Sequence, residues 1–285
     1  MMEPAPFDIG RYVTRSRAVD LSGIAWDEVR NYPLPAGTVR TLRYMQDIEC
    51  HTIVYLRELL ATRVIDDPEV AAFLPCWFYE EAFHGRALAR FLEAAGHSTI
   101  ERVRSRESFR KRLEAAAIAG IGRMWRDFTA AHMSWGAINE LTTLTGYKRL
   151  TEVAQHPVLD ELLKRIIRDE SRHFDFYFRQ AERRLKSPGA ARVTRFLIEH
   201  FWAPVGSGVQ PVEEVRFLAR YLLSGPEGRD AARRIDSTIG TLPGLAGVRL
   251  VESWVDRECG RGDSDRFSAA GGVPVGDVAE CVPNS

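Results

Sequence analysis

The sequence predicts an all-α protein, organised as a four-helix bundle with additional C-terminal helices. Three observations lead to this prediction. Apolar residues recur at helical spacing along four long segments. Turn signals separate these segments, and the apolar-polar alternation typical of strands is not evident along the chain. The connections within each pair of helices are short, which is the layout of a bundle.

The first pair of helices is expected over residues 40–60 and 66–95. One stripe of the first helix holds Leu42, Met45, Ile48, Glu49, Thr52, Ile53 and Leu56. The second helix begins at residues 66–69 (DDPE), where an aspartate can cap the helix and a proline takes the first helical position. Gly96 supplies the left-handed residue that commonly ends a helix.

The second pair is expected over residues 107–154 and 156–186, and Gly120 and Gly122 are positions where the first of these can bend. His156-Pro157 starts the second. Shorter helices are expected over residues 190–202, 211–223, 227–240 and 247–258. The chain therefore divides into an N-terminal segment (1–39), the bundle (40–187), helices packed on the bundle (188–260) and a loosely held tail (261–285).

Composition excludes several classes of protein. The chain has 285 residues, with 39 Lys plus Arg against 39 Asp plus Glu, and a dedicated nucleic-acid binder would show a basic excess. Its apolar runs are shorter than the roughly 18–20 residues that span a membrane. Residues 1–15 lack the layout of a secretory signal, and the four cysteines form no C-x-x-C pair. We expect a cytoplasmic protein that binds neither nucleic acid nor membrane.

Two Glu-x-x-His motifs are the first sign of chemistry. Glu81 precedes His84 in the second long helix, and Glu170 precedes His173 in the fourth. This spacing places a carboxylate and an imidazole one turn apart on the same helix face. One such pair occurs often by chance, so the motif alone carries little information.

Two further glutamates turn the pair of motifs into a pattern. Glu49 lies 32 residues before Glu81, and Glu140 lies 30 residues before Glu170. At about 1.5 Å of rise per residue, each pair returns to one level on the two arms of a helical hairpin. The sequence therefore predicts two similar hairpins, each supplying Glu plus Glu-x-x-His at the same height of the bundle.

The surroundings of these glutamates indicate metal. Glu49 and Glu140 lie among small and apolar residues at helical spacing, where an unpaired carboxylate is very costly. Two divalent cations would compensate four buried carboxylates, and carboxylates with single imidazoles suit iron or manganese better than zinc. The alternative is that Glu81 and Glu170 form surface salt bridges and that the histidines are incidental. That alternative explains neither the repeated spacing nor the apolar neighbours.

At these motifs the sequence resembles the soluble acyl-acyl-carrier-protein desaturases, a ferritin-like di-iron family. Residues 77–85 (WFYEEAFHG) are similar to the family's W-x-x-E-E-N-R-H-G segment, with Ala82-Phe83 in place of Asn-Arg. Residues 169–173 (DESRH) are similar to its D-E-K-R-H segment, and residues 140–143 (ELTT) match an E-x-x-T. The resemblance covers about residues 40–186 and fades after 188.

The resemblance implies a ferritin-like bundle that holds two iron ions (Fe²⁺/Fe³⁺), with manganese as the alternative metal. The implied ligands are Glu49, Glu81, His84, Glu140, Glu170 and His173. Glu81 and Glu170 would bridge or flank both ions. Thr143 matches a hydroxyl beside the oxygen-binding face, although a threonine bonded to its own helix is an equal alternative. Asp169 matches a carboxylate that orients the imidazole of His84.

The function expected from this resemblance is O₂-dependent desaturation of an acyl chain bound to acyl-carrier protein. Electrons would come from a ferredoxin-type donor, since no flavin or nicotinamide fingerprint is present. The resemblance also implies a homodimer. One alternative is a hydroxylase or N-oxygenase of a small specialised metabolite, because substrate choice lies outside the ligand set. A second is a ferroxidase or iron-binding protein.

Residues 101–112, rich in arginine, suit either a solvated helix face or docking of an acidic partner.

Overall fold

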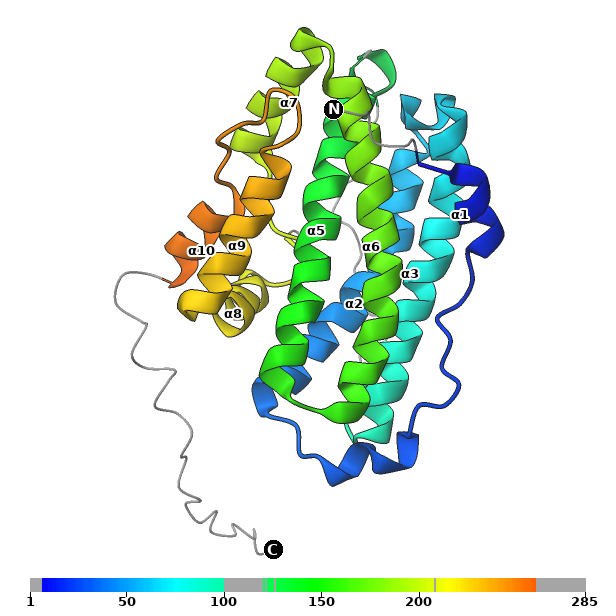
Figure 1. Ribbon diagram of the computed structural model, residues 1–285, viewed down its shortest axis with the longest axis vertical. Coiled ribbons are helices and arrows are strands. Elements are labelled where there is room, and N and C mark those ends of the chain that lie inside the picture. The colour runs from blue at the N-terminus through cyan, green and yellow to red at the C-terminus, as the bar shows by residue number, and fades with distance from the viewer. Residues whose placement is uncertain (1–6, 100–119, 121, 126, 208, 260–285) are drawn as a thin grey trace, which may run out of the picture.

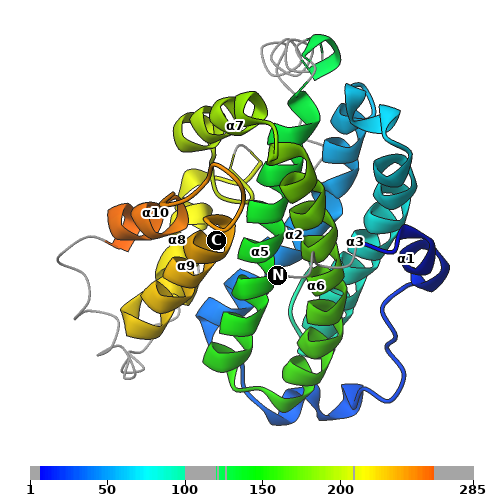
Figure 2. The same cartoon turned by 45° about the horizontal axis from the view of Figure 1, so that its top comes forward.

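Four long helices form a bundle in the computed structural model (Figure 1), which describes residues 7–99, 120, 122–125, 127–207 and 209–259. They are α2 (Ala36–Leu59), α3 (Pro68–Ala94), α5 (Phe128–Ala154) and α6 (Pro157–Leu185). α2 packs on α3 and α5 packs on α6, and the two hairpins close the bundle through contacts of α3 with α6 and of α2 with α5 (Figure 2). The core between them is lined by buried apolar side chains from all four helices.

The bundle helices begin and end where local chemistry requires it. The Asp67 side chain accepts hydrogen bonds from the backbone N–H groups of Glu69 and Val70, at 3.0 and 3.2 Å, directly before Pro68. Both bonds satisfy helix donors that would otherwise lack a partner. α5 ends at Gln155, which adopts a left-handed conformation with φ of 48°. His156 then caps α6 by accepting from Leu159 N at 3.1 Å.

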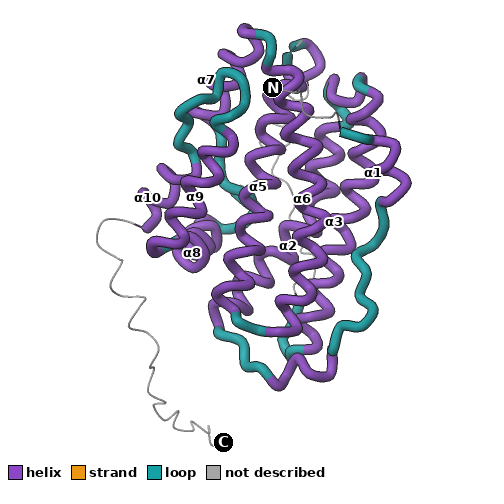
Figure 3. The backbone as a smooth tube through the Cα atoms, viewed as in Figure 1, coloured by secondary structure: helices purple, strands orange, loops and turns teal. Residues whose placement is uncertain are grey.

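Shorter helices pack on two sides of the bundle, as the tube in Figure 3 shows. α1 (Ile9–Arg15) lies against α3, and two 3₁₀ helices cover Trp26–Asn31 and Arg63–Asp66. On the other side lie α7 (Pro188–Phe201), α8 (Val212–Leu223), α9 (Gly225–Ile239) and α10 (Val251–Cys259). α7, α8 and α9 all contact α5, whereas α10 contacts α8 and α9.

The segment between α7 and α8 covers the bundle between α2 and α5. Trp202 Nε1 lies 3.4 Å from Asn139 Oδ1 on α5, and the Tyr44 hydroxyl on α2 donates to the backbone oxygen of Val205. Gly206 has a φ of +88°, and a Cβ atom there would meet the Tyr44 hydroxyl at 1.9 Å. Only glycine combines this backbone conformation with so close an approach.

The prediction of an all-α fold is confirmed. α2, α3 and α6 lie close to the expected ranges, and the helix expected over 107–154 is present as α5 from Phe128 onward. The residues at 107–119, the basic segment 101–112 and the tail 261–285 lie outside the described residues. α1 and both 3₁₀ helices were not expected from the sequence.

None of the helices in the described ranges combines the length and the apolar composition that crossing a membrane requires.

Candidate metal centre

Six buried glutamates and histidines meet at one level of the bundle. Glu49 comes from α2, Glu81 and His84 from α3, Glu140 from α5, and Glu170 and His173 from α6. All six are at most 7% exposed. The structure therefore brings together every residue that the spacing and the resemblance placed in the ligand set.

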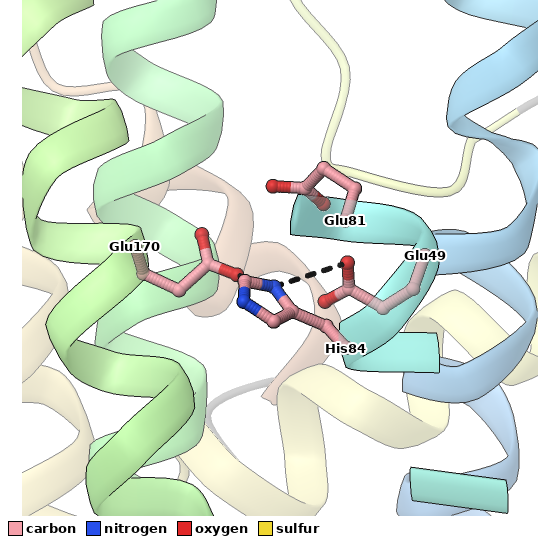
Figure 4. A group of neighbouring side chains, drawn as sticks. All are labelled: Glu49, Glu81, His84 and Glu170. Carbon is pink, nitrogen blue, oxygen red and sulfur yellow. Dashed lines mark ion pairs between the residues drawn. The ribbon is translucent and has the colours of Figure 1, made fainter. Parts of the chain in front are cut away.

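The six side chains form two overlapping groups, each able to hold a metal ion. Glu49, Glu81, His84 and Glu170 form the first, drawn in Figure 4, where they converge from α2, α3 and α6. Glu81, Glu140, Glu170 and His173 form the second. Within each group the ligand atoms lie within 4.8 Å of one another. Glu81 and Glu170 belong to both groups, so two ions bound there would share these carboxylates.

Each imidazole presents its Nδ1 atom to the carboxylates. His84 Nδ1 lies 3.2 Å from Glu170 Oε1 and 3.9 Å from Glu49 Oε2. His173 Nδ1 lies 2.9 Å from Glu81 Oε1, 3.6 Å from Glu170 Oε2 and 3.9 Å from Glu140 Oε2. The two halves of the centre are thus arranged alike, around one carboxylate pair.

Most of these converging atoms have no hydrogen-bond partner. The unpartnered atoms are Glu49 Oε2, Glu81 Oε1, His84 Nδ1, both oxygens of Glu170, and His173 Nδ1. The 2.9 Å approach of His173 to Glu81 is an electrostatic contact without hydrogen-bonding geometry. A buried polar atom left without a partner costs about 1–3 kcal/mol, and more when it carries charge. A group of buried ligand atoms that face one another without hydrogen-bond partners is the arrangement expected of a cation-binding site.

Burial opposes the charge on the carboxylates. It raises the pKa of Glu49 well above its ordinary value, and the neighbouring Glu81 adds to the effect. Burial and Glu170 raise the pKa of Glu140 in the same way, and they raise that of Glu81 to about 7. Without a cation the cluster therefore holds protons near neutral pH, and bound cations would displace them.

The histidines and Glu170 show the opposite balance. Burial alone lowers the pKa of His84, but contacts with Asp169 and Glu170 raise it to about 9. Burial raises the pKa of Glu170, but His173 and His84 together lower it to about 2. Glu170 is therefore the carboxylate most firmly ionised in the centre, which suits a residue shared by two cations.

A second pair of carboxylates, Glu80 and Asp169, holds the outer nitrogens of the histidines. His84 Nε2 lies 3.2 Å from Asp169 Oδ2, and His173 Nε2 lies 2.8 Å from Glu80 Oε2. Each outer carboxylate immediately precedes a shared glutamate and reaches the histidine of the opposite helix. With Nε2–H donating outward, the lone pair of Nδ1 faces the centre, so these contacts fix which nitrogen can bind metal.

Arg172 and Tyr12 hold the outer carboxylates. Arg172 Nη2 lies 2.8 Å from both Glu80 Oε1 and Asp169 Oδ1, so a single guanidinium joins the two halves of the centre. The Tyr12 hydroxyl, carried by α1, donates to Glu80 Oε2 at 2.8 Å. Asp169 was predicted to orient His84, whereas Glu80 was not predicted. Its position before Glu81, matching that of Asp169 before Glu170, is the signal that could have found it.

Two further hydrogen-bond donors position Glu140 and Glu49, the two glutamates that each belong to a single group. Trp77 Nε1 donates to Glu140 Oε1 at 3.1 Å, and the Tyr147 hydroxyl donates to Glu49 Oε1. Neither role is readable from the sequence. Thr143 is half-buried on α5, one turn beyond Glu140. That location is beside the centre, and it leaves the predicted proton-relay role of Thr143 a prediction.

A scan against protein-family models and a search of curated proteins both found no match to this chain. The geometry of the centre shows two buried groups of glutamate and histidine that could each hold a metal ion.

Proposed function

We propose that the protein is an O₂-dependent oxidoreductase with a di-iron centre. The observation that carries this proposal is that two four-residue groups share Glu81 and Glu170, while most of the atoms that face one another lack hydrogen-bond partners. Four carboxylates carry four negative charges, which two divalent cations balance inside the bundle. Four oxygen-donor side chains with two imidazoles favour iron or manganese over zinc, and the resemblance to the desaturases favours iron.

The chain's own residues would hold such a centre in defined positions. Glu49 and His84 would hold one ion, Glu140 and His173 the other, and Glu81 and Glu170 both. Bound iron supplies the exchange of electrons with O₂ that protein side chains cannot perform. The protein keeps each imidazole in one orientation through Asp169 and Glu80 and excludes water by burying the ligands.

The first candidate substrate is an acyl chain on acyl-carrier protein, with electrons delivered by a ferredoxin-type donor. Both follow from the resemblance of residues 77–85 and 169–173 to the desaturase motifs. A second candidate reaction is hydroxylation or N-oxygenation of a small molecule. Two buried polar side chains within about two helical turns of ligand residues, His132 on α5 and Tyr177 on α6, favour this second reaction, because each has a polar atom that lacks a partner.

Product analysis with iron-loaded protein, a chemical reductant and O₂ tests the proposal. The substrates are acyl chains on acyl-carrier protein, small alcohols and amines, and Fe²⁺ alone, with products identified by mass spectrometry. Glu170→Ala should abolish every oxidation and iron binding together. The matched control is Glu161→Ala, which removes an exposed glutamate of the same helix and should leave both intact. Oxidation of Fe²⁺ alone, with no organic product, would instead indicate a ferroxidase.

A further inference from the structure

A complete layer of aromatic side chains lies across the bundle beside the metal centre. Each bundle helix supplies one member: Tyr55 from α2, Trp77 from α3, His132 from α5 and Tyr177 from α6. Neighbouring rings touch all the way round. The centroid distances are 6.1 Å for Tyr55–Trp77, 6.0 Å for Trp77–Tyr177, 6.2 Å for Tyr177–His132 and 5.6 Å for His132–Tyr55. We call these four residues the aromatic layer.

The aromatic layer adjoins the metal centre directly. His132, Gly136 and Glu140 follow one another at four-residue spacing on the same face of α5. A Cβ atom on Gly136 would lie 2.3 Å from Tyr177 Cδ1, so the Tyr177 ring rests on α5 between His132 and Glu140. Tyr177 also follows His173 by one turn of α6, and Trp77 donates directly to Glu140.

Two polar atoms of the aromatic layer are buried without a partner. They are the Tyr177 hydroxyl and His132 Nε2, on side chains that are 0% and 7% exposed. Each buried polar atom left without a partner costs about 1–3 kcal/mol, a cost that an aliphatic side chain would avoid. Tyr55 is half-buried and its hydroxyl lies 3.4 Å from His132 Nδ1, so one side of the layer reaches the surface.

The charges around the aromatic layer restrict what can bind there. Burial lowers the pKa of His132 to about 3, so its imidazole is neutral at physiological pH. An anion buried in the aromatic layer would therefore find no cationic partner in His132. A neutral group that both donates and accepts hydrogen bonds suits a tyrosine hydroxyl and a neutral imidazole nitrogen, which can each do the same.

We propose that the aromatic layer binds a hydroxyl or amino group of the substrate and holds the adjoining bond beside the metal centre. This inference rests on the proposed function, since it names the substrate chemistry of the same centre. The aromatic layer would select a small organic molecule that carries a neutral polar group near the bond to be oxidised. A plain alkyl chain at this position would leave His132 and Tyr177 unsatisfied.

Binding of four probes that share one ring tests the proposal. Phenol, aniline, benzene and benzoate are titrated into the full-length, iron-loaded chain and followed by ligand-observed NMR. Phenol and aniline should bind about tenfold or more tighter than benzene, the factor that one or two hydrogen bonds supply. Benzoate should bind most weakly. Equal affinities for phenol and benzene, or no binding of phenol, would overturn the proposal.

Variants that keep each ring locate the binding. Tyr177→Phe and His132→Phe remove the unpartnered atoms and should erase the preference for phenol over benzene. They should also raise the melting temperature of the ligand-free chain, because an unsatisfied buried atom disappears. The control is Tyr44→Phe, which removes a buried tyrosine hydroxyl bonded to Val205 and should keep the preference. If His132→Phe fails to fold, Tyr177→Phe decides the matter alone.

The same experiment separates this inference from the proposed function. Iron content is measured on each sample before the probes are added. A chain that binds two irons but does not prefer phenol contradicts the aromatic-layer proposal and leaves the di-iron proposal standing. A chain that prefers phenol but binds no iron contradicts the di-iron proposal, while the aromatic layer remains a binding site for neutral polar groups.

Discussion

In the metal-free chain, the free energy of unfolding should decrease as the pH rises, because the buried cluster binds protons when the chain is folded. The perturbation is chelation of the full-length chain, followed by denaturation at a series of pH values. In the metal-free chain the pKa of Glu81 lies at about 7 instead of 4.5, and that of His84 at about 9 instead of 6.5. Both groups therefore bind protons more tightly when the chain is folded.

The two pKa values set the size and the direction of the change in the free energy of unfolding. The raised pKa of Glu81 contributes roughly 3 kcal/mol that is present below pH 4.5 and is lost as the pH rises to about 7. The raised pKa of His84 contributes roughly 3 kcal/mol that is present below pH 6.5 and is lost by about pH 9. Burial also raises the pKa values of Glu49 and Glu140, which act in the same direction as Glu81.

Urea denaturation followed by circular dichroism measures this dependence. The free energy of unfolding of the metal-free chain should decrease between pH 4.5 and 9, and Glu81→Gln should flatten the part below pH 7. The metal-loaded chain should show no such decrease, because bound metal requires deprotonated ligands and binds more tightly as pH rises. A metal-free chain whose stability is constant or increasing over this range would refute the arrangement of the cluster.

Two further predictions concern the contacts around the centre. Asp169→Asn and Glu80→Gln should each weaken metal binding by about 10- to 100-fold in a chelator competition, because each replaces the charged acceptor of one histidine's outer nitrogen by a neutral amide. Unchanged affinity in both variants would contradict the role given to these carboxylates. Gly136→Ala should destabilise the chain by about 1–3 kcal/mol in urea denaturation, because its Cβ atom would lie 2.3 Å from the Tyr177 ring. An unchanged denaturation midpoint would show that Tyr177 does not rest on α5 there.

The bundle was readable from the sequence because its signals are local. Helix periodicity marks α2, α3 and α6, and the caps at Asp67 and His156 place two of their starts within a residue or two. Glu49 and Glu81 were predicted to lie at the same level along the bundle axis because a helix rises by a constant amount per residue. Such arguments need only distances along the chain.

Contacts between helices could not be read in this way. The reach of Glu80 to His173 and the span of Arg172 depend on how far α3 lies from α6 and on how the two are rotated. The aromatic layer needs all four helices in place before Tyr55 and His132 become neighbours. Tyr12 was missed because α1 is short and owes its position to packing on α3 rather than to a strong local pattern.

The metal content of the folded chain tests the central claim most directly. The chain is reconstituted anaerobically with Fe²⁺, freed of unbound metal, and analysed for iron per polypeptide, with its fold checked by circular dichroism. The two groups that share Glu81 and Glu170 predict two irons per chain, and loss of iron in His173→Ala. A folded chain that retains no iron, or a His173→Ala variant that binds iron like the unaltered protein, would contradict the di-iron centre.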